Sequence, residues 1–255
     1  MLGTSMSYMT FVSDDNIELE GNVDLNLLNV YGMFGIAENI NAFVSIPFKR
    51  WNQYNVEENP DSDHKNKIKK GLGDISVNLR WIVKNNVMGP GQKLFINGKI
   101  TLPTGQKITE EDKSLRLGTG QYSGSLGFEW WWRSKFPWVF GVSGSASVPI
   151  TESDIGYKPG NSINLQLQTL RQVAVYGEIY PYFKLRFINS TSEIGIGMIE
   201  NNSAKKQLNG AVGLEYKWTN TRSISLMYDQ PFNHDLEGSQ LIGKTISLSI
   251  REILN

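Results

Sequence analysis

Charged side chains recur at every second position of several segments whose other positions are apolar. Glu215 and Lys217, for example, alternate with Leu214, Tyr216 and Trp218. Charges repeated in this way could line a water-filled path, or they could pair with one another and fill it. The residues predicted to line such a path are Arg80, Lys99, Glu129, Glu178, Tyr180, Lys184, Glu215, Lys217, Asp229 and Arg251.

This set carries both signs and gives no evident preference for anions or cations. We therefore expect any pore to be narrow and weakly charge-selective. Replacing Lys184 and Lys217 by Glu should shift ion selectivity if both line the path. Tyr180 and Tyr182, beside Lys184, could guide a solute or simply occupy space.

The sequence offers little catalytic chemistry. Its two histidines, His64 and His234, lie far apart in predicted loops and do not form a metal-binding motif. His234 and Asp235 with Ser239 could form part of a lipase-like site, but no oxyanion-hole or nucleophile motif accompanies them. Phosphate-binding and dinucleotide motifs are absent as well. We expect no enzyme, no cofactor and no metal site.

The strongest charge pattern runs from Glu57 to Lys70, acidic first and then basic. Asp61 and Asp63 could hold a divalent cation, and the lysines could bind lipopolysaccharide phosphates. A solvated surface loop explains the same composition more simply.

The elements that carry the inner charges are predicted strands. Between residues 74 and 84, Val77, Leu79 and Trp81 share one face, while Asn78 and Arg80 share the other. A period of two is the signature of a strand with different surroundings on its two faces. The pattern recurs along the chain and favours an all-β, antiparallel up-and-down transmembrane barrel with lipid outside and a polar lumen inside.

We predict one barrel domain over residues 1–255, with short periplasmic turns and longer extracellular loops. The short connections fall near 38–39, 85–91, 133–136, 171–172 and 219–220, and the long ones at 13–23, 52–71, 103–118, 150–160, 186–206 and 232–239. The twelve predicted strands are 4–13, 24–37, 40–51, 72–84, 92–102, 119–132, 137–149, 161–170, 173–185, 207–218, 221–231 and 240–253.

Tryptophans separate the two ends of this predicted barrel. Trp51 lies at a long loop, and the other six, Trp131 among them, lie beside short turns. Tryptophan gathers where a membrane meets water, so the distribution predicts an aromatic girdle on the periplasmic rim. Its predicted members are Trp81, Trp130, Trp132, Trp138 and Trp218.

Soluble sandwiches, lipocalin-like barrels and propellers also alternate in this way. Glycine at apolar positions, as at Gly124, Gly177 and Gly210, fills a core poorly, however, and charges occupy the middle of the opposite faces. These features, with the girdle and the loop asymmetry, favour the membrane barrel.

Composition agrees with this interpretation. The chain has 255 residues with 25 basic and 25 acidic side chains, a balance that argues against nucleic acid as a partner. Cysteine is absent, which excludes disulfides and thiolate metal sites. Met1 to Thr10 does not have the pattern of a signal peptide, so we take the sequence to be a mature or re-engineered form.

Four short motifs resemble one family. They are Gly71-Leu-Gly-Asp74, Leu102-Pro-Thr-Gly105, Leu117-Gly-Thr-Gly120 and Gly156-Tyr-Lys-Pro-Gly160, and their order and spacing over about residues 28 to 253 resemble the phenol-degradation meta-pathway (MetA-like) outer-membrane "transporter" barrels. The resemblance implies a twelve-stranded barrel in a Gram-negative outer membrane that passes small, often hydrophobic compounds.

Two functions follow as expectations. The first is a passive channel for small solutes, in contact with outer-membrane lipid and lipopolysaccharide. The second is an accessory barrel with a closed lumen that serves as a subunit of a larger outer-membrane protein complex.

Overall fold

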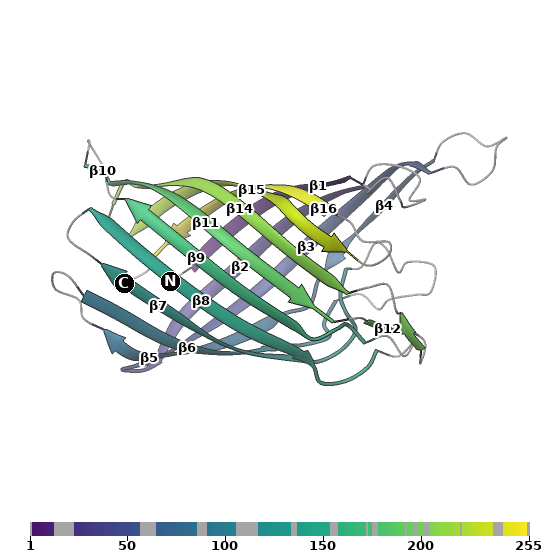
Figure 1. The fold of residues 1–255 in the computed structure, drawn as a ribbon, viewed down its shortest axis with the longest axis horizontal. Helices are drawn as coiled ribbons and strands as arrows, with labels where there is room; N and C mark the ends of the chain where they lie inside the picture. Colours follow the sequence, from purple (N-terminus) through teal and green to yellow (C-terminus); the bar gives the residue numbers. More distant parts are fainter. Residues whose placement is uncertain are drawn as a thin grey trace.

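Strands form wherever apolar and polar residues alternate, and they close into a barrel in the computed structural model of the chain (Figure 1). The structure describes residues 2–12, 23–56, 65–85, 91–105, 117–133, 137–153, 158–171, 173–174, 178–191, 193–195, 198–200, 204–219, 221–236 and 242–253. Within these ranges no helix is long and apolar enough to cross a membrane.

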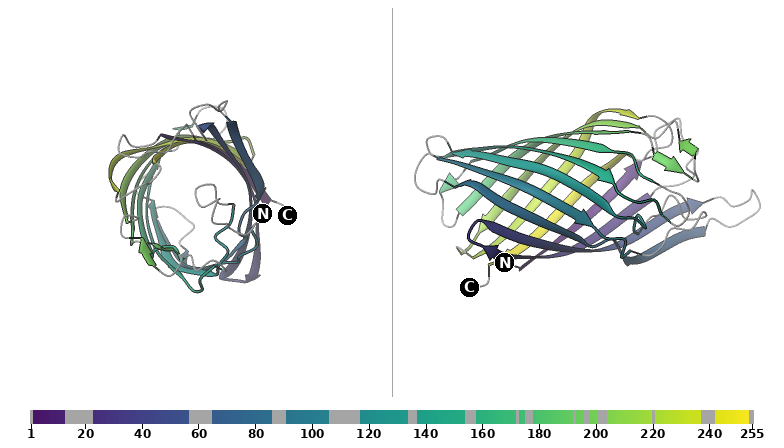
Figure 2. Two further views of the ribbon diagram at one scale, coloured as in Figure 1. Left: turned by 90° about the vertical axis from the view of Figure 1, so that its right-hand side faces the viewer. Right: turned by 90° about the horizontal axis from the view of Figure 1, so that it is seen from below.

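Each strand of the barrel pairs antiparallel with two neighbours, and the ring closes because β11 pairs with both β9 and β14. Seen along its axis, the ring is plain in Figure 2. Its strands, in the order of the chain, are β1 (Leu2–Val12), β2 (Val23–Ala37), β3 (Ile40–Val56), β5 (Ser76–Asn85), β6 (Gly91–Thr101), β7 (Ser123–Arg133), β8 (Trp138–Pro149), β9 (Ser162–Arg171), β11 (Glu178–Ser190), β14 (Lys205–Lys217), β15 (Arg222–Leu236) and β16 (Ile242–Glu252). The predicted twelve-stranded antiparallel barrel is confirmed.

The two ends of the barrel differ. At one end, β1 begins and β16 ends, with Leu2 paired to Glu252, and a turn at Glu38 and Asn39 joins β2 to β3. We call this the turn end, and the opposite end, where Val12 pairs with Ile242, the loop end. Both termini lie at the turn end (Figure 2).

Four further strands lie outside the ring. β4 (Lys65–Leu72) pairs with β3 and projects with it at the loop end, and β10 (Val173–Ala174) pairs with β11. β12 (Glu193–Gly195) and β13 (Met198–Glu200) form a small separate hairpin.

Several predicted boundaries are wrong, most of them at the loop end. Two expected long loops begin as continuations of strands, since β3 runs to Val56 and β15 to Leu236. The loop expected over 186–206 contains the end of β11 and the β12–β13 hairpin. The strand expected over 72–84 is β5, which begins later, at Ser76, while Leu72 is the last residue of β4. The strand expected over 173–185 is divided between β10 and β11 at the turn end. β4 and the ends of β3 and β15 are rich in polar residues, so ladder hydrogen bonds form them without a clear apolar alternation.

The apolar side chains face outward. Leu126 is 72% exposed, and large apolar residues on every ring strand whose side chains are described share this outward position. A soluble protein does not expose so continuous an apolar surface, whereas hydrocarbon solvates it. Inside the barrel, a small cluster joins Leu25, Trp51 and Leu117 with Met9 near the loop end.

Candidate functional site: the interior of the barrel

A cavity of about 510 Å³ lies inside the barrel near the turn end, and we call it the turn-end cavity. Its lining comes from β5 to β9 and from β11, β14 and β16, and only the interior of a closed ring borders so many strands at once. In the strand order, β14 and β16 lie across the ring from β5 and β7. Five of the predicted lumen residues line it: Arg80, Tyr180, Glu215, Lys217 and Arg251.

Arg80 is held on one wall of this cavity by several partners. Its guanidinium donates to Glu129 and lies 3.7 Å from the centre of the Phe95 ring. Glu129 also accepts from the Asn97 amide at 3.1 Å and from the Trp131 indole at 3.4 Å. Both charged side chains are more than two-thirds buried, which strengthens their attraction compared with a surface pair.

The opposite wall carries a second charged pair. Arg251 on β16 donates to Glu215 on β14 at 2.6 Å and so bridges the intervening strand β15. Nearer the loop end, Asp229 is 5% exposed and accepts from Arg186 at 2.7 Å and from the Asn209 amide at 2.8 Å. Ion pairs therefore fix these side chains against the wall, as the filler interpretation expects, but they leave space between the walls.

Tyr180 and Tyr182 each lie close to the ammonium group of a lysine. Lys217 Nζ lies 4.2 Å from the centre of the Tyr180 ring, and Lys184 Nζ lies 5.0 Å from that of Tyr182. The Tyr180 hydroxyl donates to Glu178, which pairs with Lys217 across the β11–β14 ladder. A cation over an aromatic face is attracted by the ring quadrupole.

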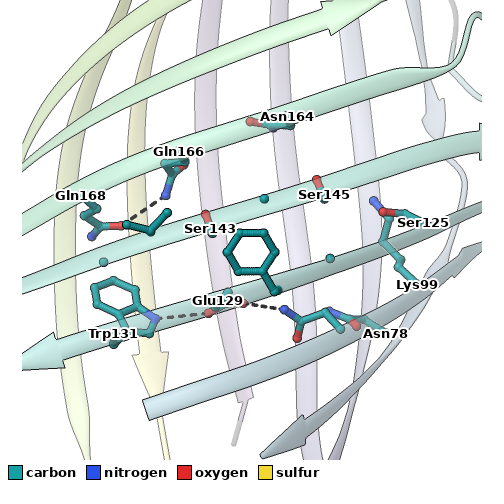
Figure 3. A pocket seen from close by; sticks show the side chains of 16 residues that line it. Asn78, Lys99, Ser125, Glu129, Trp131, Ser143, Ser145, Asn164, Gln166 and Gln168 are labelled. Carbon is teal, nitrogen blue, oxygen red and sulfur yellow. Dashed lines mark hydrogen bonds between the residues drawn. The ribbon is translucent and has the colours of Figure 1, made fainter. Parts of the chain in front are cut away.

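A second cavity, of about 370 Å³, is lined by small polar side chains of β5 to β9 (Figure 3). We call it the serine–amide cavity. Lys99 and Glu129 border it, and Gln166 donates to Gln168 at 3.3 Å on its wall. Trp131 lines both cavities, so it stands at the boundary between them. The other side chains that line the serine–amide cavity include Asn78, Ser125, Ser143, Ser145 and Asn164.

Asp74 joins three of the motifs on which the family resemblance depends. Its carboxylate accepts from the Gly105 amide at 2.9 Å, from the Thr119 amide at 2.5 Å and from the Thr119 hydroxyl at 2.7 Å. In addition, the Thr104 hydroxyl accepts a hydrogen bond from the Ile75 amide at 2.8 Å. Segments separated by more than 40 residues in the chain therefore meet at one carboxylate beside the loop end.

The anchor at Asp74 also explains the position of Leu117, which lies two residues before Thr119 and enters the barrel there. Its side chain is 1% exposed and packs against Leu25 and Trp51 on the wall formed by β2 and β3. Gln121 is also 1% exposed. Together they narrow the interior at the loop end. Trp51, which the sequence places at a long loop, lies inside the barrel with this cluster.

The five predicted girdle tryptophans occur on the outside of the turn end. All are between 39% and 52% exposed, and Trp132 stacks on Phe140 with the ring centres 4.7 Å apart. Trp131 differs from its two neighbours because it occupies the inward position of β7 and packs over Gly141 on the adjacent strand.

The catalytic candidates gain no support. His234 and Asp235 lie in strand β15, not in a loop, while Ser239, Asp61, Asp63 and His64 fall outside the described residues. Within the described ranges, no group of three His, Cys, Asp or Glu residues could hold a metal ion.

Alternation identified which residues share the inner face but missed several that shape the site. Arg186 was assigned to a connection, and Asp74 to the strand expected over 72–84, although it lies between β4 and β5. Phe95, Val139 and Leu170 are apolar residues at inward positions. The signal for Arg186 was its even spacing from Lys184 and Tyr182. For Asp74 it was the Gly-Leu-Gly-Asp motif itself.

Comparison with known proteins places the fold. No protein-family model matches the chain, and no curated protein matches it in sequence. The COG4313 outer membrane channel from Pseudomonas putida F1 superposes with a TM-score of 0.73 at 13% identity, over 99% of this chain and 95% of that one.

Two further solved structures resemble the chain along its whole length. The NanC porin superposes with a TM-score of 0.60 at 8% identity, covering 100% of both chains. The beta domain of the Bordetella autotransporter BrkA gives 0.57 at 11% identity, covering 99% of each. Identities this low establish the architecture alone. The chain has the fold of the outer-membrane β-barrels.

Proposed function

We propose that this chain is a Gram-negative outer-membrane barrel that acts as a narrow passive channel for small solutes. The two interior cavities support this most directly, because a barrel that is only structural has no need of unfilled space between opposite walls. Trp131 borders both cavities, and it would form the waist of a continuous path.

A planar-bilayer recording of the purified protein tests the proposal. We expect small, stable conductance steps from the isolated chain, and larger steps from Trp131→Ala because that variant widens the waist. Trp130→Ala is a matched control, since Trp130 is the preceding residue of β7 and lies on the outer face. Silence of the wild-type protein would contradict this function, and equal steps from both variants would show that Trp131 does not form the waist of the path.

The accessory-barrel alternative has one observation in its favour. Leu117 and Gln121 are fully buried inside the loop end, and the Leu25–Trp51–Leu117 cluster could keep that end closed. An accessory barrel would be silent in the bilayer and would co-purify with a stoichiometric protein partner. The channel proposal requires conductance without any partner.

The surroundings of the barrel belong to the same proposal. Outer-membrane lipid would cover the apolar belt, and the lysines of β4, such as Lys70 at the loop end, would meet lipopolysaccharide phosphates. We propose no nucleic-acid partner. Membership of the MetA-like family is likewise proposed, on the motifs that meet at Asp74.

A further inference from the structure

We propose that the turn-end cavity binds an amphipathic organic anion, an apolar group that carries a carboxylate. This inference rests on the channel proposed above and names the class of solute. An anion site differs from the sequence-based expectation of a pore without charge preference. The chain as a whole is neutral, but basic side chains outnumber acidic ones around this cavity.

The first argument is the excess of basic side chains around the cavity. Five basic residues line it and only one acidic residue, Glu215, does so. The basic residues come from opposite walls: Arg80, Lys93 and Arg133 from β5 to β7, and Lys217 and Arg251 from β14 and β16. Like charges that converge across a cavity with low-dielectric walls create a positive potential at its centre.

The second argument is that local carboxylates neutralise this charge only in part. Glu129 pairs with Arg80, Glu215 pairs with Arg251, and Glu178 lies beside Lys217 in the ladder. Among the described residues, Lys93 and Arg133 have no carboxylate within 4.0 Å. Two ammonium or guanidinium donors thus remain for a ligand.

The third argument is the apolar part of the lining. Phe95, Val139 and Leu170 occupy inward positions beside the basic residues of this cavity, and the rings of Trp131 and Tyr180 adjoin them. Apolar and aromatic surface beside a few fixed charges is the usual composition of a small-molecule site. A purely inorganic anion would gain nothing from this surface.

The serine–amide cavity makes a useful contrast. It offers hydroxyl and amide groups with one basic residue, Lys99, and one acidic residue, Glu129. That lining suits a neutral, hydrogen-bonding solute or plain water. The combination of positive charge and apolar surface belongs to the turn-end cavity.

The experiment measures binding of radiolabelled benzoate to the full chain in detergent, with benzamide as the neutral analogue of nearly the same shape. We expect saturable binding of benzoate and much weaker binding of benzamide. The Lys93→Gln/Arg133→Gln variant should lose roughly tenfold in benzoate affinity, equivalent to about 1.4 kcal/mol. Lys244→Gln/Arg171→Gln removes the same charge from the exposed outer side and should bind like the wild type.

A parallel bilayer recording separates this inference from the channel itself. Current that benzoate reduces and benzamide does not, with a reversal potential that favours anions, supports both. Conductance without benzoate binding, or with equal binding of the two probes, overturns the anion site and leaves the channel. Benzoate binding without conductance overturns the channel and keeps the site.

Discussion

Three inward-facing aromatic side chains of the described strands pack over a glycine on the neighbouring strand. Tyr182 covers Gly213, and Trp131 covers Gly141, each pair directly opposed in the ladder. The missing Cβ lets the ring rest on the backbone, so the ring narrows the lumen from one side without pushing the strands apart. Tyr31 and Gly3 repeat the arrangement on β1 and β2.

Gly213→Ala tests this packing. A Cβ at residue 213 would overlap the Tyr182 ring, so we expect a loss of about 1–3 kcal/mol in the free energy of unfolding, the usual cost of overpacking. Urea unfolding in lipid vesicles measures it.

Two variants control that experiment. Adding Tyr182→Ala to Gly213→Ala should restore much of the lost stability, because the ring is then absent. Gly98→Ala, whose Cβ would lie at an ordinary 3.7 Å from Leu126, should change little. A Gly213→Ala protein as stable as the wild type would show that the ring can move aside freely.

The connections at the loop end depend on one carboxylate. Asp74 receives three hydrogen bonds from Gly105 and Thr119, and these fix the segment that brings Leu117 into the barrel. A carboxylate that accepts several hydrogen bonds is a stronger anchor than a turn made from backbone alone.

Asp74→Ala should release this anchor. The amide hydrogens of Gly105 and Thr119 should exchange with solvent roughly tenfold faster or more, since a hydrogen bond to a charged group contributes about 1.5–3 kcal/mol. Hydrogen exchange followed by mass spectrometry checks this, with Asp24→Ala on β2 as the control. Unchanged exchange in Asp74→Ala would mean that packing of Leu117 alone holds the segment.

The sequence predicts the positions of most strands, but it does not predict which distant segments contact one another. Alternation set the register of β5, β14 and β16 because a slip of one residue would turn every apolar side chain inward. It could not reveal that Arg186 meets Asp229, or that Asp74 meets Thr119, since each pair joins segments more than 40 residues apart. β4 escaped prediction because its residues are mostly lysine and polar.

The barrel as a whole has an apolar outside and a polar inside, and neighbouring residues of one strand test this directly. Leu126→Lys places a charge on the most exposed part of the outer face, so it should cost about 2–4 kcal/mol in a bilayer if the site lies near the midplane. Ser125→Lys adds the same side chain to the serine–amide cavity and should cost far less. Urea unfolding in vesicles compares them.

Equal costs for the two lysine variants would mean that lipid does not cover Leu126. The same measurement in detergent micelles should reduce the difference, because a micelle adapts to a charge more easily than a bilayer. The comparison therefore reports on the membrane and not only on packing.

The pairing of β1 with β16 means that the first and last segments of the chain are neighbours from Leu2–Glu252 to Val12–Ile242. Until that seam forms, the sheet has two unpaired edges, each of which can bind another chain. The seam also joins residues with the greatest separation in sequence, and such contacts are slow to form. A chain that lacks β1 or β16 would form an open sheet whose exposed edges can aggregate. Synthesis of the whole chain must therefore be complete before the barrel can close and protect these edges.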